Sequence, residues 1–60
     1  MSSAVTGEVW DVVVLPEEPP MIAISIVVPG GAVYTIELRL EQCERLEALL
    51  GVAVRQALRR

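Results

Sequence analysis

The chain has 60 residues, enough for one small domain, which standing alone buries only about 60% of the surface that its unfolded form exposes. One cysteine and no histidine exclude an internal disulfide and a structural zinc site, the usual supports of so small a domain. The net charge of −3 argues against nucleic acid as the main partner, and a hydrophobic content of 53% exceeds what so small an interior holds. We therefore expect some apolar side chains to meet a partner chain.

We expect a cytoplasmic protein with a reduced thiol and no membrane partner. The N-terminus lacks the basic and apolar regions of a secretory signal, and residues 1–7 predict a flexible tail on a single domain, 1–60. The longest apolar run, Met21–Val28, is interrupted by Ser25 and is shorter than the roughly 20 residues with which a helix crosses a bilayer.

Three segments have the composition or the alternation of β-strands. Val9–Leu15 is rich in valine, and a proline-rich loop over residues 16–20 separates it from Met21–Val28. Ala32–Leu40 alternates apolar and polar residues and follows Pro29-Gly30-Gly31, which predicts a hairpin built on a type I turn with Gly31 in the left-handed region. The chain then passes into a helical pattern almost without a linker.

The loop lengths predict the pairing of these strands. A three-residue loop places Ile22, Ile24 and Ile26 opposite Leu38, Ile36 and Tyr34. A five-residue loop places Val14, Val12 and Trp10 opposite Ile22, Ile24 and Ile26, and Trp10 is expected to anchor the core between sheet and helix. Both registers put apolar side chains on the same face of the sheet.

Apolar residues at spacings of three and four predict an amphipathic helix from about Glu41 to Leu58. The helix contains Gly51, which marks either a break or a close approach by another backbone, at a cost of about 1 kcal/mol relative to alanine. The predicted fold is therefore α+β: a three-stranded antiparallel β-meander followed by one C-terminal amphipathic α-helix packed on one face of the sheet.

The apolar residues on the other face of the sheet predict a homodimer with two-fold symmetry. These residues form a candidate interface: Val9, Val13, Leu15, Met21, Ala23, Val27 and Val33. The first and third strands are also unpaired edges without a lysine or an interior proline. The dimer can therefore form through a face of the sheet or through one of its edges, and the sequence does not decide between the two. Ala48, Gly51 and Val52 offer a smaller helix–helix contact as a third route.

No set of residues in the sequence predicts catalysis, a cofactor or a metal site. Cys43 has no histidine to pair with and lies on the apolar stripe of the helix, where a small core residue is expected. Glu41, Glu44 and Glu47 are expected on the polar side of the helix, and Glu17 and Glu18 lie in the proline-rich loop. Pro29-Gly30-Gly31 is too short for a phosphate loop. We therefore do not expect an enzyme.

Thr35–Leu40 followed by Glu44–Leu49 resembles the strand and first helix of ribbon-helix-helix repressors. The resemblance implies a turn at Leu50-Gly51-Val52 and a short second helix over Val54–Leu58. It also implies a dimer that reads the DNA major groove with Thr35, Glu37 and Arg39, whereas residues 8–31 have no counterpart in that fold.

Two functions are compatible with these patterns. The first is a small non-enzymatic interaction or structural protein that acts as a homo-oligomer or as an accessory subunit of a larger assembly, with itself and possibly another protein as partner. The alternative is a small DNA-binding regulator of the ribbon-helix-helix type. Binding to DNA would depend steeply on salt, which separates the two.

Overall fold

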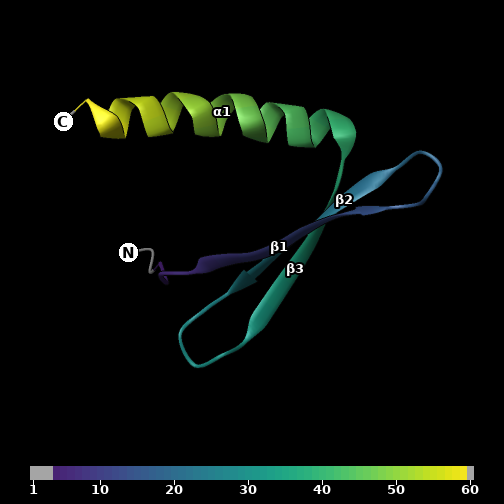
Figure 1. Ribbon diagram of the computed structural model, residues 1–60, viewed down its shortest axis with the longest axis horizontal. Helices are drawn as coiled ribbons and strands as arrows, with labels where there is room; N and C mark the ends of the chain where they lie inside the picture. Colours follow the sequence, from purple (N-terminus) through teal and green to yellow (C-terminus); the bar gives the residue numbers. More distant parts are fainter. Residues whose placement is uncertain (1–3, 60) are drawn as a thin grey trace.

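The computed structural model describes residues 4–59 and shows one antiparallel sheet followed by one helix (Figure 1). The elements are β1 (Glu8–Leu15), β2 (Met21–Val27), β3 (Val33–Arg39) and α1 (Leu40–Leu58). The strand order is β1-β2-β3, so each strand pairs with its neighbour in the sequence. The α+β class, the meander and the single C-terminal helix are confirmed, and every boundary lies within one residue of the prediction. Residues 1–3 of the predicted tail lie outside the described residues.

The hairpin between β2 and β3 has the predicted register but a different turn. Ile22, Ile24 and Ile26 pair with Leu38, Ile36 and Tyr34. The Gly31 N–H donates to the Val28 carbonyl at 3.0 Å, and φ is +99° at Gly30 and +92° at Gly31. A positive φ at the third position, after Pro29 at the second, defines a type II turn, so the expected type I turn is wrong.

The pairing of β1 with β2 contains a bulge that the sequence pattern does not predict. Val14 and Val12 lie opposite Ile22 and Ile24 as predicted, but Val9 rather than Trp10 pairs with Ile26. Trp10 is the extra residue of the bulge, and its side chain is exposed instead of anchoring a core between sheet and helix. The bulge also moves Val9 to the face of the sheet that carries Ile26.

The registers sort the strand residues into two faces of different chemistry. The apolar face carries Val9, Val12, Val14, Ile22, Ile24, Ile26, Tyr34, Ile36 and Leu38, none of which is charged. The mixed face carries Glu8, Asp11, Val13, Leu15, Met21, Ala23, Ser25, Val27, Val33, Thr35, Glu37 and Arg39. The alternation of strand side chains therefore gathers nearly all strand polarity on one side.

Helix α1 follows β3 directly and is continuous. It begins at Leu40 with Arg39 as its N-cap, and no side chain caps it there, as the lack of a capping residue in the sequence suggests. The helix runs through Gly51 without a break. The turn and second helix implied by the resemblance to ribbon-helix-helix repressors are therefore absent from the described residues, which contain one helix.

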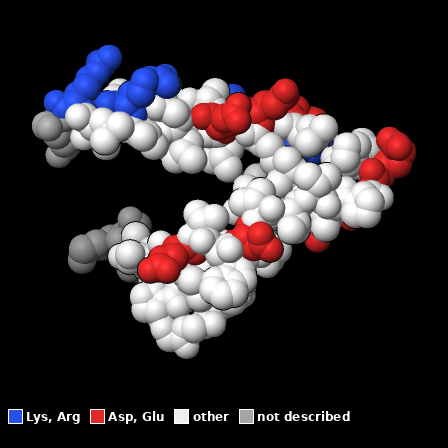
Figure 2. All heavy atoms as spheres, viewed as in Figure 1, with Lys and Arg blue, Asp and Glu red and all other residues white. Residues whose placement is uncertain are grey.

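The helix contacts the sheet only near its start. The Cys43 Sγ lies 4.0 Å from the Leu38 carbonyl oxygen, and Leu40 and Cys43 lie beside Ile22. Farther along, α1 stands clear of the sheet (Figures 1 and 2), and none of its described residues is buried. Among residues 4–59 the one buried side chain is Ala23, which is 6% exposed in the central strand. The expected cover of one face by the helix is thus limited to this junction.

Replacement of glycine should have opposite effects in the turn and in the helix. Gly31→Ala should lower the free energy of unfolding by about 1–2 kcal/mol, because a side chain is costly at positive φ. Gly51→Ala should raise it by about 1 kcal/mol, since the new Cβ would meet only the mobile end of Arg55 at 3.4 Å. Denaturant titration at one fixed protein concentration measures both changes. A loss at Gly51 as large as that at Gly31 would contradict this assignment and indicate a close backbone neighbour at Gly51.

Candidate interaction surface

Six of the seven residues predicted as an interface lie together on the mixed face. Ala23 is buried there, half-buried neighbours surround it, and two valines at the margins are exposed. The half-buried residues are Leu15, Met21 and Val27, and the exposed ones are Val13 and Val33. Val9 is the exception, because the bulge at Trp10 places it on the apolar face.

Polar groups interrupt the apolar part of the mixed face. The hydroxyl groups of Ser25 and Thr35 form a hydrogen bond of 2.9 Å across β2 and β3. Glu37 lies opposite Ala23 on the neighbouring strand, and Asp11 lies opposite Ser25. A partner seated on this face would have to desolvate these groups or leave them in water. The mixed face is therefore the more polar of the two candidate surfaces.

The apolar face forms the first part of an alternative surface. Its outer strands leave large side chains exposed, and we call the four central ones the sheet wall: Val12, Val14, Tyr34 and Ile36. Strand positions two residues apart share a face, so these side chains form a continuous patch with the half-buried Ile22, Ile24 and Ile26 of β2. A patch of this kind without a charge is typical of a covered sheet face.

The helix supplies the second part of this surface. Leu50 and Val54 follow Cys43 by 7 and 11 residues, and they therefore lie on the side of α1 with which Cys43 meets the sheet. Together with their exposed neighbours they form what we call the helix wall: Leu46, Leu50, Val54 and Leu58. The helix wall begins at the junction with the sheet and continues along the part of α1 that has no contact with it.

The two walls meet at the junction and then diverge. Figure 2 shows open space between the sheet and the part of α1 beyond the junction, whereas at the junction Glu44 and Glu47 line a hollow together with Ile22. Sequence reasoning missed this surface because it assumed that the helix closes onto the sheet. The signal that could have identified it is the direct passage from Arg39 to Leu40, since strand-to-helix connections that reverse the chain usually take two to six residues.

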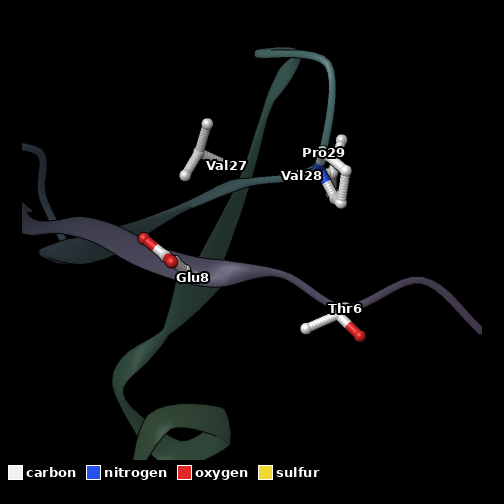
Figure 3. A pocket seen from close by; sticks show the side chains of 5 residues that line it. All are labelled: Thr6, Glu8, Val27, Val28 and Pro29. Carbon is white, nitrogen blue, oxygen red and sulfur yellow. The ribbon is translucent and has the colours of Figure 1, made fainter.

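A hollow at the end of the sheet does not have the character of a ligand site. Thr6, Glu8, Val27, Val28 and Pro29 line about 270 Å³ at the end of the sheet, less than the roughly 300–1,000 Å³ of small-molecule pockets. The Thr6 and Glu8 side chains point in different directions (Figure 3), so they do not converge on a common ligand atom.

The described residues offer little chemistry beyond apolar contact. Cys43 is half-buried at the junction and has no second cysteine to pair with in the chain. Residues 4–59 contain no group of three or more Cys, Asp or Glu side chains that could hold a metal ion. Within this part of the chain α1 is also too polar to cross a membrane.

Comparison with models of protein families, with curated proteins and with solved structures finds no match to this chain.

Proposed function

We propose that this chain is a small non-enzymatic interaction or structural protein that acts as a homo-oligomer or as an accessory subunit of a larger assembly. The observation that carries the proposal is the near absence of an interior among the described residues: Ala23 alone is buried, whereas sixteen large hydrophobic side chains are exposed. Soluble monomers seldom expose a continuous apolar surface of this kind, which typically marks a protein–protein interface.

The alternative, a DNA-binding regulator of the ribbon-helix-helix type, requires a second helix that the described residues do not contain. Its proposed reading strand would also present Glu37 to the phosphates, beside an Arg39 whose Nε lies 3.5 Å from the Glu41 carboxylate. The Glu37 carboxylate and the pairing of Arg39 with Glu41 both oppose binding to a polyanion. The interaction protein is therefore the better-supported function.

Sedimentation equilibrium of the wild-type chain tests the proposal. We expect a species of about 13 kDa or larger, at least twice the chain mass of 6.5 kDa, because association is the way to cover the exposed surface. Fluorescence anisotropy with mixed-sequence duplex DNA should show no binding at low or high salt. A folded 6.5 kDa monomer would contradict the homo-oligomer and leave only the accessory subunit, and salt-sensitive DNA binding would favour the alternative.

A further inference from the structure

We infer that the exposed walls are an interface between two copies of this chain, in which the helix wall of each copy lies on the sheet wall of the other. The inference rests on the proposed function and identifies its surface. It places the interface on the apolar face and the inner side of α1, and not on the mixed face that the sequence pattern suggests.

The first argument is that the two walls are complementary but cannot meet within one chain. A helix with an apolar side and a sheet with an apolar face form a stable two-layer structure when they pack. Here β3 ends at Arg39 and α1 begins at Leu40, so no residue is left to reverse the chain and lay the helix flat on its own sheet. A second copy supplies each missing wall, and two-fold symmetry satisfies both copies at once.

The second argument is the amount of exposed surface. The chain exposes 5399 Å², whereas a compact monomer of its mass, 6.5 kDa, exposes about 3,800 Å². The excess of about 1,600 Å² per chain corresponds to about 3,200 Å² for a pair, within the roughly 2,000–5,000 Å² that obligate homodimers bury. The excess is thus of the size that a second copy of this chain would cover.

The third argument is the match in dimensions. The helix wall runs from Leu46 to Leu58, roughly 18 Å at 1.5 Å per residue. From Met21 to Val27, β2 at the centre of the sheet spans roughly 20 Å at 3.3 Å per residue. The radius of gyration of this 60-residue chain, 13.7 Å, is that of a compact domain of about 120 residues. The chain is thus as extended as expected of one partner in an interlocked dimer.

Two substitutions on β3 test the inference, because they differ in face but hardly in exposure. Ile36 is 55% exposed on the apolar face, and Val33 is 53% exposed on the mixed face. By sedimentation equilibrium, Ile36→Glu should weaken self-association by about a hundredfold or more, since it places a charge in the contact, whereas Val33→Glu should change it by less than about threefold. The reverse order would place the interface on the mixed face and overturn the inference while the proposed homo-oligomer stands. A dimer that survives both substitutions would indicate edge pairing or the helix–helix contact and would also overturn it.

Cross-linking keeps the inference testable where a glutamate variant fails to fold. In a Cys43→Ser background, chains with Val54→Cys are mixed with isotope-labelled chains that carry Ile36→Cys or Tyr34→Cys. Mild oxidation should join the two kinds of chain, and mass spectrometry identifies the mixed disulfide. Val52→Cys, on the outer side of α1, is the matched control and should not cross-link to either position. Cross-linking through Val52 but not Val54 would overturn the inference alone, and a folded monomeric wild type would overturn the proposed homo-oligomer with it.

Discussion

Unfolding of the wild-type chain should depend on protein concentration, with a higher midpoint in concentrated solution. The reason is that the described part of a single chain buries one small side chain, Ala23, so most apolar burial must come from association. For a dimer that unfolds to two separate chains, each tenfold rise in concentration adds about 1.4 kcal/mol to the apparent stability. Urea titration monitored by circular dichroism, from about 1 µM to about 100 µM, should therefore show a gain of about 2.7 kcal/mol.

Two copies joined by a flexible glycine–serine linker provide the control for this experiment. The linker makes association intramolecular, so the midpoint should be higher and should no longer depend on concentration. The comparison separates a true association effect from aggregation, which would also affect the tethered pair. A wild-type midpoint that stays constant over the hundredfold range would show that a single chain is stable by itself.

The strand registers could be predicted because loop length and alternation are local properties of the sequence. A three-residue loop fixes which residues of β2 and β3 face each other, and an apolar face tolerates no slip by one residue. The bulge at Trp10 escaped this reasoning because Trp10 and Val9 are both apolar, so either can lie opposite Ile26 without exposing a polar group to the core face. The turn type escaped it because two consecutive glycines accept either sign of φ.

The position of the helix could not be predicted from its pattern alone. The stripe that includes Cys43, Leu46 and Leu50 shows which side of α1 avoids water, and the alternation in β3 shows the same for the sheet. Neither pattern shows whether the covering surface belongs to the same chain or to another. The connection at Arg39 and Leu40 bears on this point, because its length limits where the helix can go.

A charge on the inner side of α1 should disrupt the protein, whereas the same charge on the outer side should not. Val54 and Val52 are matched in residue type and exposure, at 48% and 46%, but lie about 200° apart around the helix. Aspartate has the same helix propensity at both sites and a similar unfavourable interaction with the C-terminal end of the macrodipole, so these costs cancel in the comparison.

Val54→Asp should therefore lower the stability of the dimer by about 3 kcal/mol or more, because the carboxylate would be buried against the partner's sheet wall without a counter-charge. Val52→Asp should change it by less than about 0.5 kcal/mol, as is usual for a residue that stays in water. Urea titration at one protein concentration and sedimentation equilibrium measure the two effects separately. Equal losses would contradict a contact confined to the inner side of α1. A larger loss for Val52→Asp would place the contact on the outer side near Ala48 and Gly51, where small residues favour packing between helices. A selective loss for Val54→Asp is expected only if the helix wall is covered. It should persist relative to the tethered wild type, because a higher effective concentration leaves the carboxylate buried against the same wall.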